Sequence, residues 1–196
     1  MQIVDIRPAE NSDSAALLHI LQVVFAEYPG CVLDIEEVPE LLQPATAFAE
    51  MGGSLWVAQH QDQVVGCVGL VPDGIPGRME LKKLYTLPAV RGRGLGRRLI
   101  EQAEFAARQR QADSLHLWTD TRFTTAHRVY ERLGYVRLPE IRKLPDTRAM
   151  RRVRALSQFL APRGQLSFGI SGWFTTTPIN CHQCPKKPFL VSTVLL

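Results

Sequence analysis

The stretch that most restricts the fold of this chain is Arg-Gly-Arg-Gly-Leu-Gly at residues 91–96, called here the 91–96 loop. A run typical of a β-strand ends just before it, and an amphipathic helix begins within it. Glycine lets the backbone turn tightly and approach a ligand closely, and the first amides of a helix have no partner inside the helix. Because the helix dipole also favours negative charge there, the loop is predicted to bind a phosphorylated cofactor.

Four arginines in and after the loop can add charge-assisted hydrogen bonds to phosphate: Arg91, Arg93, Arg97 and Arg98. Two familiar phosphate loops do not fit this sequence. A dinucleotide fingerprint needs a third glycine where Arg97 stands, and a nucleoside-triphosphate loop needs Gly-Lys-Ser/Thr, which the chain lacks. The remaining reading is R-x-x-G-x-G, formed by Arg91, Gly94 and Gly96. An ordinary helix start could contain the same residues, so the loop alone does not decide the cofactor.

A second motif makes the first more specific. R-x-x-G-x-G resembles the acetyl-coenzyme A loop of the GNAT-type N-acetyltransferases, and residues 126–135 are similar to that family's A-x-x-x-Y-x-x-x-G-F/Y signature, with Tyr130 as the tyrosine. Residues 79–88 look like the family's central strand. The resemblance covers about residues 1–146 and implies a mixed α/β domain with a mostly antiparallel central sheet flanked by helices. It also implies transfer of the acetyl group of acetyl-CoA to an amine.

The spacing of apolar residues predicts elements in a matching order. Strands are expected at residues 2–7, 54–60, 64–71, 79–87, 114–119 and 135–138. Helices are expected after the capping residues 11–13, within 91–111 and at 124–133. A further short helix is expected across residues 35–51, where Pro39 and Pro44 would interrupt it.

The resemblance also implies roles for individual residues. An amine with a lysine-like pKa of about 10.4 is almost wholly protonated near neutrality, so a base is needed, and Glu80 is the candidate. Glu80 could instead face solvent or pair with Lys82 or Arg78. Tyr130 would protonate the departing thiolate, although it could also be an ordinary core tyrosine. The residues expected to bind the cofactor are Leu84, Thr86, Arg91, Gly92, Arg93, Gly94, Gly96 and Arg97.

The acceptor cannot be identified from the sequence. Four acidic residues between the first two helices would suit a cationic amine or would simply form a solvated face: Asp34, Glu36, Glu37 and Glu40. His116, Trp118 and His127 could shape an acceptor pocket or serve only in packing. Phe123 stands where many members of the family carry an asparagine that contacts the cofactor arm. Small amines, amino acids, aminoglycoside-like compounds and protein amino groups all remain open as acceptors.

Composition predicts a globular cytoplasmic domain. The chain has 196 residues, 45% of them hydrophobic, with no run of eighteen apolar residues and no signal-like leader. Cys31 and Cys67 are expected to be reduced. Cys181-His182-Gln183-Cys184 has metal-ligand spacing, but a zinc site needs four ligands and no second pair exists, so no metal is expected.

Charge divides the chain near Thr147. All 19 acidic residues lie at or before Asp146, whereas the 49 residues after Thr147 carry seven basic and no acidic residues. Residues 1–146 are therefore predicted to form the acetyltransferase-like domain and 147–196 an atypical basic tail. The tail could bind an acidic partner, be loosely ordered or result from an altered reading frame. Its arginines would attract nucleic acid only non-specifically, which makes nucleic acid an unexpected partner.

The tail is expected to deprive the sheet of its closing strand. Residues 148–160 show some helical character, while 165–174 or 189–196 could each supply a strand. Two functions follow. One is an acetyl-CoA-dependent N-acetyltransferase acting through a ternary complex, with no membrane partner and with a homodimer left open. The other is a non-catalytic acyl-CoA-binding or interaction module whose C-terminal part is compromised.

Overall fold

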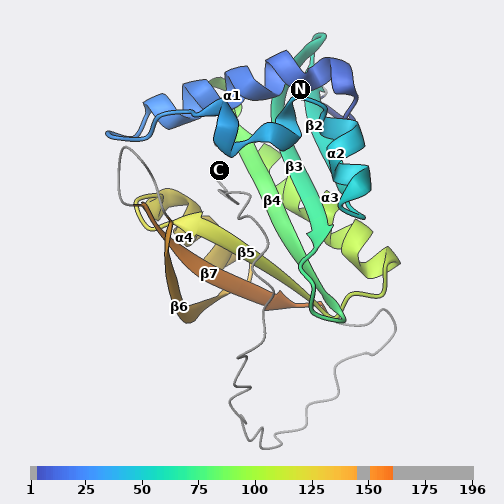
Figure 1. The fold of residues 1–196 in the computed structure, drawn as a ribbon, viewed down its shortest axis with the longest axis vertical. Coiled ribbons are helices and arrows are strands. Elements are labelled where there is room, and N and C mark those ends of the chain that lie inside the picture. Colours follow the sequence, from blue (N-terminus) through green and yellow to red (C-terminus); the bar gives the residue numbers. More distant parts are fainter. Residues whose placement is uncertain (1–3, 145–150, 161–196) are drawn as a thin grey trace, which may run out of the picture.

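A seven-stranded sheet runs through the described residues, 4–144 and 151–160, of the computed structural model (Figure 1). The strands lie in the spatial order β1-β2-β3-β4-β5-β7-β6. Only β4 and β5 are parallel neighbours, so the predicted mixed, mostly antiparallel sheet is confirmed. The strands are β1 (Asp5–Pro8), β2 (Ser54–His60), β3 (Gln63–Pro72), β4 (Arg78–Thr86), β5 (Ser114–Asp120), β6 (Val136–Leu144) and β7 (Arg151–Phe159).

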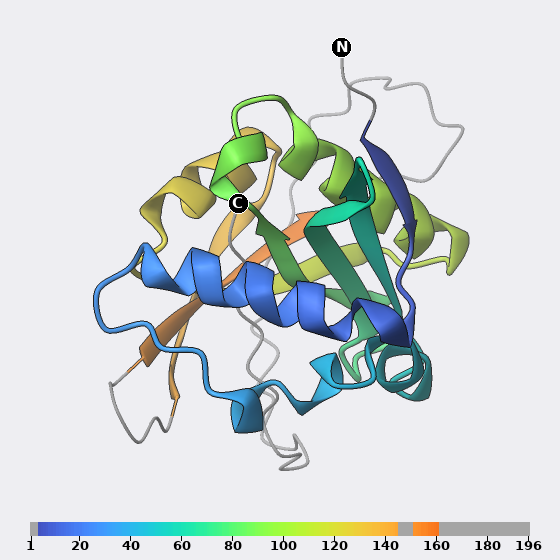
Figure 2. The same ribbon diagram turned by 90° about the horizontal axis from the view of Figure 1, so that it is seen from above.

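Helices cover both faces of the sheet. Figure 2 shows α1 (blue) on one side and α3 and α4 (yellow-green to yellow) on the other. The α-helices are α1 (Ser14–Ala26), α2 (Pro44–Glu50), α3 (Leu95–Gln109) and α4 (Thr124–Arg132). Short 3-10 turns are η1 (Asn11–Asp13), η2 (Ile35–Glu37), η3 (Pro39–Leu41) and η4 (Pro88–Val90).

The amphipathic pattern explains how α1 and α3 pack. α1 buries Leu17, Ile20, Leu21, Val24 and Phe25, and α3 buries Leu95, Leu99, Ile100, Ala103 and Ala107. Each set repeats at intervals of three and four residues, which places it on one side of a helix. Two glycines of β3 let helices approach the sheet. A Cβ on Gly69 would meet Phe48 of α2 at 2.3 Å, and one on Gly66 would meet Leu99 of α3 at 3.3 Å.

Prolines divide the segment in which one interrupted helix was expected. Pro39 begins η3 and Pro44 begins α2, so residues 35–51 form two 3-10 turns and one short α-helix. Proline fits the first turn of a helix because its missing amide would be unpaired there anyway. The result is a folded segment between α1 and β2 in place of one continuous helix.

The expectation for the end of the sheet is wrong. Residues 151–159, within the stretch predicted to have helical character, form β7, which pairs with β5 on one side and β6 on the other. Ala155 and Leu156 of this strand are buried, and pairing with two strands outweighs the local helix preference of the sequence. The sheet therefore has its closing strand. Of the tail predicted at residues 147–196, residues 151–159 thus form β7. Residues 147–150 and 161–196, with the strands expected at 165–174 and 189–196, lie outside the described residues.

A β-bulge in β4 opens the centre of the sheet. Cys67 and Gly69 of β3 pair with Tyr85 and Lys82, so Lys83 and Leu84 together stand opposite one residue of β3. Lys83 has a left-handed backbone with φ of +50°. A bulge bends its strand and increases the local twist. Pairing between β4 and β5 ends at Leu81 and Leu117, and Figure 1 shows the two strands diverging beyond that point.

Candidate active site

The 91–96 loop joins the end of β4 to α3 and has the backbone of an anion-binding turn. Gly92 and Gly94 adopt left-handed conformations, with φ of +73° and +79°. Gly94 is the N-cap of α3, and its carbonyl accepts a hydrogen bond of 3.1 Å from the Arg98 amide. The amides of the first helical turn, including that of Gly96, precede this first bond, so the helix itself offers them no acceptor.

The space in front of the two glycines is open. A Cβ on Gly92 or on Gly94 would meet no atom within 4 Å. By contrast, a Cβ on either glycine of β3 would meet a neighbouring atom closely, at 2.9 Å for Gly66 and 2.3 Å for Gly69. A loop with left-handed glycines, unpaired amides and free space before it fits a phosphate group.

Arg91 is already engaged within the protein. Its guanidinium donates to Glu27 at 2.7 and 2.8 Å and to the Thr86 carbonyl at 2.9 and 3.1 Å. Glu27 is the C-cap of α1, and Thr86 is the last residue of β4. Arg91 therefore fixes the loop to two other elements, and this arrangement does not leave its guanidinium open for a phosphate.

The other arginines in and after the loop differ in whether their guanidinium groups are already bound to protein groups. Arg97 pairs with Glu101 on the exposed surface of α3 at 2.8 Å, and Arg98 donates to the Val4 carbonyl at 2.9 Å. Within the described part of the chain, Arg93 makes no hydrogen bond or ion pair and is exposed. Arg93, followed by Arg97, is best placed to add positive charge at the mouth of the loop.

Leu84 and Thr86 lie in the half of β4 that has separated from β5. Both are buried. Thr86 pairs with Gly66 of β3 and Leu84 lies in the bulge, while the edge of β4 that faces β5 has no strand neighbour there. An extended ligand chain can add to such an edge as a further strand would.

Tyr130 of α4 lies near Tyr85 of β4. It is fully buried, and its hydroxyl has no hydrogen-bond partner among the described residues. Its ring meets that of Tyr135 edge-on, with 5.5 Å between centroids. Burial, and then the neighbouring hydroxyls of Tyr135 and Tyr85, raise the pKa of Tyr130 well above its ordinary value. The hydroxyl is therefore protonated at neutral pH and can donate a proton or a hydrogen bond.

Glu80 lies at the paired end of the opening. In β4 it stands opposite Val71 of β3 and level with His116 of β5. It is half-buried, and it forms no ion pair with any residue in 4–144 or 151–160. The predicted pairing with Lys82 or Arg78 is thus not seen, since Arg78 pairs with Asp73 instead. Leu84 and Thr86 thus lie in the half of β4 without β5 beside it, which leads into the 91–96 loop, whereas Glu80 lies in the half that pairs with β5.

A buried ion pair beneath the opening was not anticipated. Lys83 Nζ lies 2.8 Å from Glu40 Oε1, and both side chains are almost wholly buried. Burial lowers the pKa of Lys83, while Glu40 opposes that shift. Glu40 is therefore not part of the solvated acidic face in which it was grouped. The sequence signal was weak, because only the bulge turns Lys83 toward η3.

Aromatic and polar packing accounts for the other residues singled out near α4. Phe123 is buried against Tyr28, with 4.5 Å between ring centroids. His116 meets Trp118 edge-on at 5.3 Å, and His127 Nε2 lies 3.0 Å from the Asp120 carbonyl. These contacts link the end of β5 and the start of α4 to the segment after α1.

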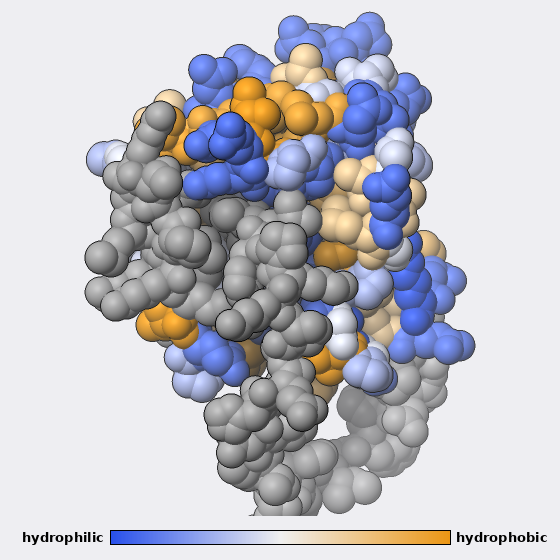
Figure 3. Space-filling view, in the orientation of Figure 1, coloured by the Kyte–Doolittle hydropathy of each residue, from blue (hydrophilic) through white to orange (hydrophobic). Residues whose placement is uncertain are grey.

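The rim above the opening mixes apolar and acidic side chains. Figure 3 shows apolar side chains gathered on the face over α1. The segment after α1 contributes exposed Val32 and Ile35, and Asp34 accepts a hydrogen bond from the Glu36 amide at 3.0 Å. An acceptor entering from this side would meet both apolar and acidic groups.

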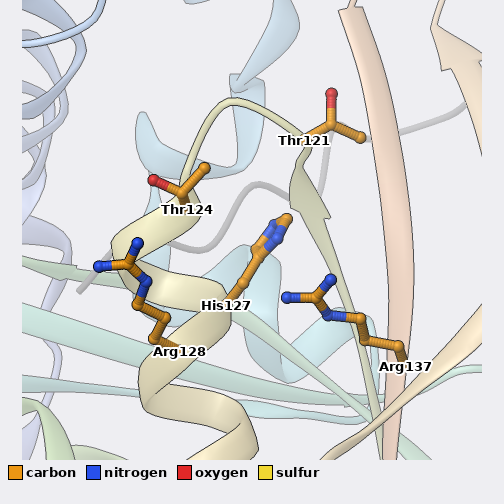
Figure 4. Close-up of a pocket in the computed structure, with 5 residues that line it drawn as sticks. All are labelled: Thr121, Thr124, His127, Arg128 and Arg137. Atoms are coloured by element: carbon orange, nitrogen blue, oxygen red, sulfur yellow. The ribbon is translucent and has the colours of Figure 1, made fainter.

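A separate hollow lies beside α4. It has a volume of about 300 Å³ and is lined by Thr121, Thr124, His127, Arg128 and Arg137. Figure 4 shows His127 between the two arginines, with the two threonines at the other end. Arg137 is paired with Glu131. His127, which could shape an acceptor pocket, lines it, but none of the residues expected to be catalytic or to bind the cofactor does.

No group of three or more His, Cys, Asp or Glu side chains in the described part of the chain is arranged to hold a metal ion. The paired cysteines Cys181 and Cys184 lie outside it. No helix in the same residues has the length and apolar character needed to cross a membrane.

Residues 17–135 match the protein family described as "Acetyltransferase (GNAT) family", which is more than half of the chain. The chain belongs to the GNAT acetyltransferase family. It is 32% identical over 130 residues to the uncharacterized N-acetyltransferase YjgM of Escherichia coli, a match that covers 63% of this chain and 76% of YjgM. Acetyl transfer from acetyl-CoA is the general activity of GNAT proteins, as the resemblance implied.

Solved acetyltransferase structures share the fold. An acetyltransferase from Streptococcus agalactiae superimposes with a TM-score of 0.70 at 23% identity, covering 82% of this chain and all of that one. The yncA protein of Salmonella typhimurium, solved with acetyl-CoA, gives a TM-score of 0.64 at 19% identity over 83% of this chain and 96% of its own. At these identities the likeness concerns the fold.

Proposed function

We propose that this GNAT protein transfers the acetyl group of acetyl-CoA directly to an amine while both substrates are bound. The observation that supports this most is the Tyr130 hydroxyl, which is fully buried, protonated at neutral pH and without a partner among the described residues. A buried polar group is normally hydrogen-bonded, so this hydroxyl requires a ligand atom. The coenzyme sulfur would supply it.

The residues present fit the coenzyme at three points. The first-turn amides of α3, with Gly92, Gly94 and Gly96, would hold the pyrophosphate, and Arg93 and Arg97 would add charge. The free edge of β4 at Leu84 and Thr86 would bind the pantetheine arm. Arg91 would act as a positioning residue, because its contacts with Glu27 and Thr86 fix the loop. Acetyl-CoA supplies the reactive thioester when bound.

The proposed step balances with two protein groups. The amine nitrogen forms a bond to the acetyl carbonyl carbon, and the carbon–sulfur bond breaks. Glu80, directly or through water, accepts the proton that the amine loses, and Tyr130 gives a proton to the departing sulfur. An amide of the free β4 edge would stabilise the charge that develops on the carbonyl oxygen.

The main argument for the alternative function, a non-catalytic acyl-CoA-binding or interaction module, no longer holds. It assumed that the sheet lacked its closing strand, whereas β7 occupies that position between β5 and β6. The two functions are distinguished by isothermal titration with acetyl-CoA, followed by thiol release over a panel of amines. We expect binding and release with at least one amine. Binding with no thiol release from any amine would contradict catalysis, and no binding would contradict the cofactor assignment.

A further inference from the structure

Lys82 is a buried cation that no described residue neutralises. Only 5% of its surface is exposed. Within residues 4–144 and 151–160 it makes no hydrogen bond or ion pair, and Glu40 is paired with the neighbouring Lys83 at 2.8 Å. A mostly buried lysine whose charge has no partner in the described residues is suited to bind an anionic ligand.

The register of the sheet places Lys82 on the acceptor side. Lys82 pairs with Gly69, and Gly69 faces Phe48 of α2. Directly paired residues of antiparallel strands project to the same face, so Lys82 points to the face that carries α1 and α2. The 91–96 loop lies at the start of α3, which covers the opposite face. The anion that binds Lys82 is therefore not a phosphate of the coenzyme.

Glu80 accompanies Lys82 on that face. The two residues are separated by one position of β4 before the bulge, which places them on the same side of the strand about 6.5 Å apart. Glu80 also has no ion-pair partner in the described residues. Two unpaired groups of opposite charge at this spacing are complementary to a ligand that carries an ammonium and a carboxylate.

We propose that the acceptor is a primary amine that also bears a carboxylate, of the amino-acid class, and that Lys82 binds the carboxylate while Glu80 receives the amine. This proposal rests on the acetyl transfer proposed above and specifies its second substrate. It favours free amino acids over peptide N-termini, since the α-carboxylate of an N-terminal residue is consumed in the peptide bond. The rim residues between α1 and α2 would then contact the side chain of the amino acid.

The test compares free amino acids with their carboxamides, which keep the amine and lose the negative charge. Thiol release at saturating acetyl-CoA gives kcat/KM for each pair. We expect the parent protein to prefer the free acid by about ten- to hundredfold, the range of one hydrogen bond to a charged group. Lys82→Met should lower kcat/KM for the acid by the same factor and change that for the carboxamide less than about twofold. Lys82→Arg should retain part of the preference.

Two further measurements distinguish a failure of the amino-acid proposal from a failure of the proposed acetyl transfer. The Kd of acetyl-CoA should be the same for the parent and Lys82→Met, and Lys82→Gln serves as a second neutral variant if the methionine variant does not fold. If no amine releases thiol, the transfer proposed above fails, but the assignment of Lys82 can still be tested by thermal-shift binding of free amino acids against carboxamides. Equal use or equal binding of the two ligand forms, or an equal loss for both in Lys82→Met, would overturn the proposal.

Discussion

Arg91 and Glu27 join the 91–96 loop to the end of α1 through two hydrogen bonds of 2.7 and 2.8 Å. The same guanidinium also donates to the Thr86 carbonyl at the end of β4. One side chain thus holds three elements that are distant in sequence. Its partly exposed position makes the ion pair worth about 0.5–1 kcal/mol, so its main effect is on the order of the loop.

Replacing Arg91 with Met should therefore weaken acetyl-CoA binding by about tenfold, because the loop must be ordered on binding. Isothermal titration measures the effect. Glu27→Gln removes the opposite partner without touching the loop and should weaken binding in the same direction. The double variant should lose less binding free energy than the two single variants lose together, because both substitutions remove the same interaction. Full additivity would mean that Arg91 contacts the ligand itself.

Gly94 offers a test of the anion site with a matched control. Its φ of +79° is tolerated by Asn and Asp better than by other non-glycine residues. Gly94→Asp and Gly94→Asn have nearly the same shape, so they differ chiefly in charge. The Asp variant should bind acetyl-CoA at least tenfold more weakly than the Asn variant. Equal dissociation constants in two folded variants would place the pyrophosphate elsewhere.

Tyr130→Phe removes one hydroxyl and retains the ring against Tyr135. Turnover should fall by about 10²- to 10⁴-fold, the range of general acid assistance, while the Kd of acetyl-CoA changes by only a few fold. The melting temperature should not fall, because the lost hydroxyl has no partner in the described residues. A variant that turns over at the parent rate would exclude Tyr130 as the proton donor.

The buried thiol of Cys67 should make the free energy of unfolding depend on pH in the alkaline range. Burial raises the pKa of its thiol to about 12 from an ordinary value near 9. Because the folded state keeps the proton longer than the unfolded state, this contribution to stability is full below pH 9 and decreases as pH rises toward 12, by up to about 1.4 kcal/mol per pH unit. Chemical denaturation between pH 8 and 11 should show a flatter decline for Cys67→Ala. Parallel curves would mean that the thiolate forms in the native state.

The place of β7 predicts where the chain can be shortened. A chain ending at residue 160 contains all seven strands and should unfold cooperatively. A chain ending at residue 146 lacks β7, so β5 and β6 lose their shared neighbour and expose two strand edges, which favours aggregation. Circular dichroism and gel filtration distinguish the two. A well-folded 1–146 chain would show that β7 is dispensable.

Much of the fold could be predicted because its signals are local. The hairpin of β2 and β3, the stripe of α3 and the turn at residues 91–96 each follow from neighbouring residues. The strand β7 could not be predicted in this way, since residues 151–159 contain arginine, alanine and leucine at spacings that also suit a helix. Pairing with β6 on one side and with β5, more than thirty residues earlier, on the other fixes them as extended chain.

In the candidate site, too, some residues could be predicted from local motifs and others could not. The loop glycines and Tyr130 stand in motifs and were predicted by position. The roles of Arg91, Lys82 and Lys83 depend on partners brought close by the fold: Glu27 at the end of α1, Gly69 across the sheet and Glu40 in η3. A bulge at Lys83 decides which lysine meets Glu40 and which remains unpaired. No local pattern in the sequence marks that bulge, because lysine is not a typical residue for a left-handed backbone.

The position of β7 between β5 and β6 also imposes an order of events during synthesis. A ribosome releases β1 to β5 well before β7, so the first five strands can pair while β6, although already made, has no partner. Until residue 159 has left the exit tunnel, the edge of β5 stays open and Trp118, which packs beside Ala155, lacks that neighbour. Slow translation or a premature stop between residues 144 and 151 would therefore leave a nascent chain with a completed 91–96 loop and an unfinished sheet beyond β5.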